Sequence, residues 1–137
     1  MIIKKTFNMK KLFYISIFTL LFVSCQESLE DRCAREAMSY TEKKCPAKLG
    51  ENTTIDSLIF ERESHTLHYY YTLTGNADNM GVFSSVDIRK ILLDEVKNST
   101  SIKAYKDNGY NFAYTYLSGK DKGKVLFNAT FTEKDYK

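Results

Sequence analysis

Strict alternation of side chains over residues 66–74 is the feature that most constrains the fold of this chain. Every second position is apolar or aromatic and the positions between are more polar: Leu67, Tyr69, Tyr71 and Leu73 against Thr66, His68, Tyr70 and Thr72. A period of two with β-branched and aromatic residues is typical of a β-strand with one buried face. Residues 54–61 alternate in the same way, and the polar stretch 62–65 predicts a turn between them. Together the two segments predict a β-hairpin.

A second hairpin is predicted near the C-terminus, where residues 110–117 and 124–132 alternate around a turn, followed by a charged tail at 133–137. One face of these strands is expected in the core: Tyr110, Phe112, Tyr114, Tyr116, Val125, Phe127, Ala129 and Phe131. The solvent face of both hairpins then carries seven side chains that form a candidate binding face: His68, Tyr70, Thr72, Asn111, Thr115, Asn128 and Thr130. The alternative is a face stabilised only by cross-strand pairs.

Two amphipathic helices complete the predicted fold. Apolar side chains recur at helical spacing over residues 29–44, and Pro46 stops this helix because the residue before a proline avoids the α region. Residues 85–98 carry apolar side chains at i, i+4 and i+8, with Ser84 or Ser85 as the N-cap. The order helix, hairpin, helix, hairpin predicts an α+β domain whose four-stranded antiparallel sheet has helices on one face. This topology is cystatin-like by analogy.

The N-terminal segment 9–25 has the three parts of a secretion signal: a basic start, about 12 apolar residues and a small Ser24 before Cys25. The apolar run is too short to cross a ~30 Å hydrocarbon core as a helix. Residues 22–25, FVSC, resemble the bacterial lipobox. That resemblance implies that Cys25 is acylated and becomes the mature N-terminus. A plain signal peptide or an N-terminal anchor helix are the alternatives.

The predicted organisation is a lipoprotein signal peptide at 1–24, with Met9 as an alternative start, a lipidated tether at 25–30 and one α+β domain at 31–137. The acylated Cys25 implies an outer-membrane protein on the periplasmic side or at the cell surface. Residues 1–24 hold four lysines and no acid, so 20 basic and 17 acidic residues become 16 and 17, and the net charge changes from +3 to −1. The charge therefore does not indicate a nucleic-acid partner.

Cys33 and Cys45 are the thiols that remain once Cys25 is acylated. An oxidising envelope favours a disulfide between them. A continuous helix opposes it, because twelve residues span ~18 Å whereas a disulfide needs Cα atoms about 4.4–6.8 Å apart. Either the helix ends early and the chain turns back, or both thiols stay free.

No motif for catalysis, a cofactor or a metal is present in the sequence, and we expect a protein that is not an enzyme. The two histidines, His65 and His68, point to opposite faces of a strand and its turn, so they are expected as surface residues. Asp78 with Asn76 and Asn79 lacks the calcium-loop pattern and is expected to form a turn.

Two sequence blocks, TTIDS…TLHYYYTL at 53–73 and GYNFAYTY…GKVLF at 109–127, together with the lipobox, resemble a family of small, uncharacterised envelope lipoproteins of the Bacteroidetes type. The resemblance implies no catalytic activity. We expect a lipid-anchored binding or accessory module with a protein partner. The alternatives are an inhibitor or immunity-type protein against a secreted enzyme or toxin and, less favoured, a small enzyme.

Overall fold

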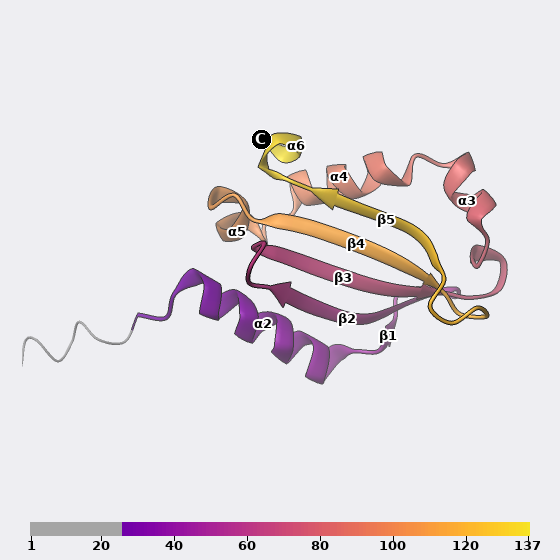
Figure 1. Ribbon diagram of the computed structural model, residues 1–137, viewed down its shortest axis with the longest axis horizontal. Coiled ribbons are helices and arrows are strands. Elements are labelled where there is room, and N and C mark those ends of the chain that lie inside the picture. The colour runs from indigo at the N-terminus through magenta and orange to yellow at the C-terminus, as the bar shows by residue number, and fades with distance from the viewer. Residues whose placement is uncertain (1–25) are drawn as a thin grey trace, which may run out of the picture.

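The fold is an α+β arrangement in which helices cover one face of a five-stranded mixed sheet (Figure 1). The computed structural model describes residues 26–137. The elements are α2 (Leu29–Lys44), β1 (Ala47–Lys48), β2 (Thr53–Glu61), β3 (Thr66–Leu73), the 3₁₀ turn η2 (Gly75–Ala77), α3 (Met80–Ser85), α4 (Ile88–Asn98), α5 (Lys103–Asp107), β4 (Asn111–Ser118), β5 (Val125–Phe131) and α6 (Glu133–Tyr136). The signal peptide expected at 1–24 and the lipidation expected at Cys25 lie outside the described residues. Within 26–137 no helix has the length and apolarity to cross a membrane.

The expectation of four antiparallel strands is wrong in two respects. The strand order is β1-β2-β3-β4-β5, and the central pair β3 and β4 is parallel. The reason is the connection between them, because α4 carries the chain back to the end of the sheet where β3 began. β4 therefore runs in the same direction as β3, as in other strand–helix–strand units. The cystatin analogy stays a prediction.

The fifth strand, β1, has only two residues, which pair with Thr54 and Ile55 of β2. It is too short to show a period of two, so the sequence pattern does not reveal it. A register shift in β5 produces a second difference. Val125 pairs with Leu117 on the sheet face that the helices do not cover, which we call the open face, and Val125 is 44% exposed. Leu126 is buried instead, so the expectation that Val125 lies in the core is wrong.

Helix α2 confirms the expected helix at 29–44. Ser28 accepts a hydrogen bond from the Asp31 N–H, and Glu30 and Asp31 in the first turn favour the positive end of the helix dipole. The helix is continuous to Lys44, and both Cys33 and Cys45 are free thiols in the structure. The chain thus takes the second of the two alternatives for this pair.

The second expected helix is divided. A short α3 ends at Ser85, and α4 starts at Ile88 with Asp87 as its N-cap, which accepts from the Lys90 N–H. The expected caps Ser84 and Ser85 lie inside α3 instead. Asp87 directly precedes Ile88, the first apolar residue of α4, so Asp87 occupies the N-cap position.

The C-terminal segment is also more ordered than a charged tail. Residues 133–136 form α6, and the buried Tyr136 hydroxyl donates to the Tyr110 carbonyl at 2.7 Å.

The core lies between the sheet and the helices. Cys33 and Ala37 of α2 and Leu92 and Val96 of α4 pack in the same cluster as the aromatic side chains of the sheet. Both long helices therefore cover the same face, as expected. Phe112, Phe131 and Val96 are completely buried.

Candidate functional site

The open face of the sheet carries all seven side chains of the predicted binding face. The strand register places most of them in two neighbouring rows that run across β3, β4 and β5. In one row Tyr70 lies beside Thr115 and Thr115 beside Asn128. One row further, His68 pairs with Ala113 and Ala113 with Thr130. Alternation alone thus predicts that these residues share one face, although β3 and β4 pair in parallel and not antiparallel as expected.

His68 is the centre of a hydrogen-bonded network on this open face. Its Nδ1 lies 2.7 Å from Glu61 Oε1, and its Nε2 lies 2.7 Å from Thr115 Oγ1. The Tyr70 ring stacks on the imidazole with 4.1 Å between ring centroids. In the next row, Thr72 donates to Asp56 Oδ2 at 2.7 Å. The polar groups on the β2 and β3 part of the open face, together with Thr115, therefore satisfy one another.

The Glu61 carboxylate, the His68 imidazole and the Thr115 hydroxyl follow one another in the order found in the catalytic triads of hydrolases. The surroundings of Thr115 do not support such a reaction. Thr115 is 9% exposed and lies in β4, between β3 and β5. The backbone N–H groups of a central strand are occupied by the sheet, so they cannot stabilise an oxyanion beside the hydroxyl. The network is best understood as a structural one.

His65 has a different environment from His68, as expected from the sequence. It adopts a positive φ of 48° in the β2–β3 turn and stacks on Tyr110 at 5.3 Å between centroids. Its Nε2 lies 3.4 Å from Glu30 Oε1. His65 therefore connects the turn to α2 and forms no pair with His68.

A second candidate site lies on the helix-covered face, in a hollow that sequence reasoning missed. We call it the tyrosine groove. It has a volume of about 320 Å³ and lies between α2 and the segment that joins α4 to α5. Its lining consists of Cys33, Glu36, Ala37, Tyr40, Leu58, Leu67, Tyr69, Ser101, Ile102 and Tyr105. The lining is mostly apolar and aromatic with a few polar groups, which is the usual composition of a binding site.

Beside Tyr69, the same face of the sheet carries further stacked tyrosines, which lie outside the lining of the groove. Tyr69 stacks on Tyr114 at 5.0 Å and Tyr71 on Tyr116 at 4.7 Å between centroids. Tyr69, Tyr71 and Tyr116 are only partly buried, so α2 and α4 do not close over them. Glu95 of α4 lies close enough to these rings to affect their ionisation.

The tyrosines of this sheet face remain protonated hydrogen-bond donors. Burial, followed by the nearby Glu95 carboxylate, raises the pKa of Tyr69 and of Tyr116 to about 12. The hydroxyls of Tyr70, Tyr105 and Tyr136 bond to protein atoms. Those of Tyr69, Tyr71 and Tyr116 make no such bond within the described part of the chain. A ligand in the groove would find in Tyr69 a donor that the described part of the fold does not use.

The thiol in the groove is not reactive. Cys33 is 1% exposed, and burial raises its pKa to about 12, so it carries almost no thiolate at neutral pH. At the other end of α2, Cys45 is partly exposed, and burial also raises its pKa.

Asp78 forms a structural turn contact. Its Oδ2 accepts from the Lys120 N–H at 3.0 Å, and it joins the loop after β3 to the β4–β5 turn. Hydrogen bonds from Ser118 and then from the Lys120 backbone lower the pKa of its carboxyl group. Within residues 26–137, no three His, Cys, Asp or Glu side chains lie in a group that could hold a metal ion.

The groove could have been suspected from one signal. Four tyrosines occupy core-facing positions of β3 and β4, and a tyrosine hydroxyl in a core needs a partner or water. Such a cluster indicates a face that is not fully closed.

Comparisons with known proteins identify the family and the fold. The family model described as Domain of unknown function (DUF8479) matches residues 28–127, and the chain therefore belongs to this family. No curated protein matches the chain.

Solved structures with the same fold include PA3611 of Pseudomonas aeruginosa, described as a candidate secreted protein. It has a TM-score of 0.63 and 14% identity, and the match covers 82% of this chain and 100% of that one. Two others are type II secretion system pilotins. EpsS of Vibrio vulnificus has a TM-score of 0.57, 10% identity and coverage of 80% and 92%. AspS of Vibrio cholerae has a TM-score of 0.54, 14% identity and coverage of 78% and 91%.

Proposed function

We propose that this DUF8479 protein is a lipid-anchored, non-catalytic accessory protein of the cell envelope that holds a segment of a partner protein in the tyrosine groove. The observation that carries the proposal is the groove between α2 and the segment that joins α4 to α5, with the partly exposed Tyr69 on its floor. Aromatic side chains in a hollow provide large contact areas, and they are enriched at the centres of protein interfaces.

The two sheet faces differ in what they offer a partner. On the open face Glu61, His68 and Thr115 already bond to one another, so a partner there would have to replace existing hydrogen bonds. In the groove the hydroxyl of Tyr69 has no protein partner within residues 26–137. Binding in the groove therefore gains apolar contact and hydrogen bonds without breaking any.

The envelope role is supported by the lipobox-like residues 22–25 and by the fold. Two structures of this fold are pilotins of type II secretion systems, so an accessory role beside an envelope assembly is one that this fold performs elsewhere. At 10% and 14% identity the likeness supports the fold, and the choice of partner has to be tested on this chain.

Adjacent positions in β3 provide the test of the binding site. A photo-crosslinking amino acid replaces Tyr69 or Tyr40 in the groove, or Tyr70 on the open face, in the full chain produced in its native envelope. We expect a defined crosslinked band from Tyr69 and from Tyr40, and none from Tyr70. A band from Tyr70 alone would move the binding site to the open face. No band at any of the three positions would contradict a binding function.

Membrane attachment is tested separately at Cys25. Labelling with a palmitate analogue should mark the wild-type chain and not a Cys25→Ser variant, and only the wild type should sediment with outer membranes. Equal sedimentation of the two would contradict the lipid anchor.

A further inference from the structure

We propose that the end of the domain where α2 begins lies directly on an anionic membrane surface, and that a lysine-lined hollow at this end binds phospholipid headgroups. This inference rests on the lipid anchor of the proposed function. It adds a fixed orientation of the domain and a second contact with the membrane.

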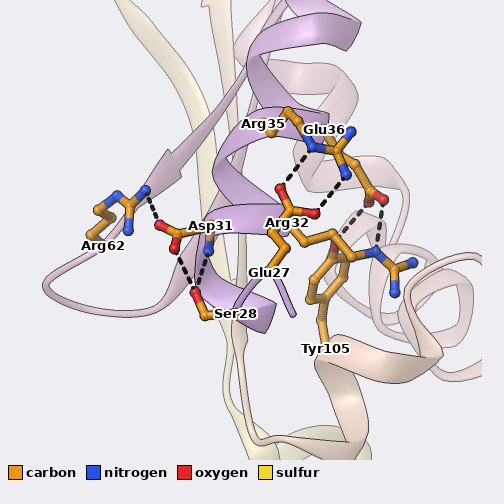
Figure 2. A network of polar contacts seen from close by, with 8 residues as sticks. All are labelled: Glu27, Ser28, Asp31, Arg32, Arg35, Glu36, Arg62 and Tyr105. Atoms are coloured by element: carbon orange, nitrogen blue, oxygen red, sulfur yellow. Dashed lines mark hydrogen bonds and ion pairs between the residues drawn. The ribbon is translucent and has the colours of Figure 1, made fainter. Parts of the chain in front are cut away.

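The first observation is the short distance between Cys25 and the folded domain. α2 starts at Leu29, and its N-cap Ser28 is three residues from Cys25. Three residues span at most about 11 Å. Glu27 is also fixed, because Arg35 donates to both of its carboxylate oxygens at 2.8 and 3.0 Å (Figure 2). The expected tether at 25–30 therefore largely belongs to the domain, and the domain cannot move far from an acylated Cys25.

The second observation is that two acidic side chains at this end are paired with arginines. Glu27 pairs with Arg35, and Asp31 pairs with Arg62 of the β2–β3 turn at 2.9 Å (Figure 2). Glu30 lies 3.4 Å from His65 of the same turn. The two arginines offset carboxylates that would otherwise be repelled by an anionic surface, and the contacts of Arg62 and His65 hold the turn against the start of the helix.

The third observation is a basic hollow at the same end. α5 and the C-terminal α6 lie at the end of the sheet where α2 begins (Figure 1). Between them and the end of α4 is a hollow of about 340 Å³. Its charged lining consists of Lys97, Lys103, Lys106, Lys137 and Asp107.

The charges of this hollow leave a positive excess. Four lysines face one aspartate in the lining, and Lys137 also pairs with Glu133 just outside it. Counting both acids, the net charge is +2. Lys103 pairs with Asp107 at 2.5 Å, and Lys106 donates to the carbonyls of Val96 and Lys97. Cations beside an anionic leaflet are attracted to it, and the attraction is lost beyond a Debye length. A hollow held close to the headgroups by the anchor is within that range.

The test compares lysines at the two ends of the molecule. The lipidated full chain is reconstituted into vesicles of phosphatidylcholine alone or mixed with phosphatidylglycerol, and the acetylation rate of each lysine is measured by mass spectrometry. We expect the acetylation rates of Lys97 and Lys103 to be lower by a factor of about three or more in the anionic vesicles than in the neutral ones. Lys120 and Lys122, in the β4–β5 turn at the opposite end, should react equally in both. Added salt should remove the difference.

Charge-reversal variants sharpen the comparison. K97E/K103E should abolish the protection of Lys106, whereas the matched control K120E/K122E should leave it unchanged. Protection of the Lys120 end instead would overturn the proposed orientation.

Three other outcomes would also overturn the proposal. Equal acetylation rates in both vesicles, with the protein firmly bound, would contradict the headgroup contact while the lipid anchor stands. Protection by added inorganic phosphate in neutral vesicles would assign the hollow to a free anion. Failure to bind either vesicle would overturn both the anchor and this inference.

Discussion

The two faces of the sheet show that exposure and availability are different properties. The open face has no helix over it in the described structure, yet the polar groups around His68 on this face are bonded to each other. The opposite face is covered by α2 and α4, yet Tyr69, Tyr71 and Tyr116 on it remain partly exposed, and within residues 26–137 their hydroxyls bond to no protein atom. A surface that is easily reached can thus be chemically satisfied, while a covered one retains capacity for binding.

The largest effect on stability is expected when a core-facing and an open-face residue of the same strand, β4, are compared. Phe112→Ala removes a completely buried ring of β4 and should lower the free energy of unfolding by about 3–5 kcal/mol because it leaves a cavity. Thr115→Ala, three residues away on the open face, should cost less than half as much. Urea denaturation followed by circular dichroism measures both. Equal losses would mean that the open face contributes to stability as much as the core.

A smaller effect is expected at the edge where the two faces meet. The Thr41 hydroxyl of α2 donates to the Leu58 carbonyl at 2.8 Å and accepts from the Leu58 N–H at 2.9 Å. Thr41→Val leaves both partly buried backbone groups of β2 without this partner, so we expect a loss of about 1–3 kcal/mol in urea denaturation. Thr41→Ser is the matched control and should retain most of the stability. A loss in Thr41→Ser as large as that in Thr41→Val would show that the methyl group contributes as much to stability as the hydroxyl.

The open-face network should show coupling between its members. His68→Ala should lower the free energy of unfolding by about 1 kcal/mol, since one of the lost hydrogen bonds is exposed and the others are only partly buried. A double-mutant cycle with Thr115→Val should give a coupling energy of about 0.5–1 kcal/mol. Additive losses would show that the 2.7 Å contact between His68 and Thr115 contributes nothing of its own.

The smallest effect concerns Glu36, which lines the tyrosine groove. Hydrogen bonds from Arg32 and then from Tyr105 lower the pKa of the Glu36 carboxyl group below its ordinary 4.5. The folded state favours the Glu36 carboxylate over the protonated form. Its contribution to the free energy of unfolding is therefore complete above pH 4.5 and is lost as the pH falls through the lower pKa of the folded state. The side chain is 43% exposed, so we expect less than about 1 kcal/mol.

The measurement for Glu36 compares Glu36→Gln with the wild type in urea at about pH 7 and about pH 3. The variant should be less stable at the higher pH, and the two should converge at the lower one. A difference that is independent of pH would show that the carboxylate charge is not involved.

Sequence periodicity predicted the faces of the strands well because alternation is a local property. Leu67, Tyr69 and Tyr71 face the core and His68 and Tyr70 the open side, as the pattern requires. The same holds for α2, whose cap at Ser28 and end before Pro46 are encoded by neighbouring residues.

What the pattern could not provide depends on pairing across long distances. The parallel arrangement of β3 and β4 results from the path of α4 between them, which no local signal encodes. The register shift that exchanges Val125 and Leu126 depends on the partner strand. The tyrosine groove depends on how far α2 and α4 lie apart over the sheet, so it became visible only in three dimensions.

The order of the strands in the sheet, β1-β2-β3-β4-β5, is also their order along the chain. Each strand therefore pairs with a strand that has already emerged when a chain is exported with its N-terminus first. The hairpins β2–β3 and β4–β5 close over short turns, whereas β3 and β4 are separated by residues 74–110. Contacts between residues far apart in sequence form slowly because loop closure has an entropic cost. We therefore expect the joining of β4 to β3 to limit the rate of folding, after α2 and the first hairpin have formed beside the membrane.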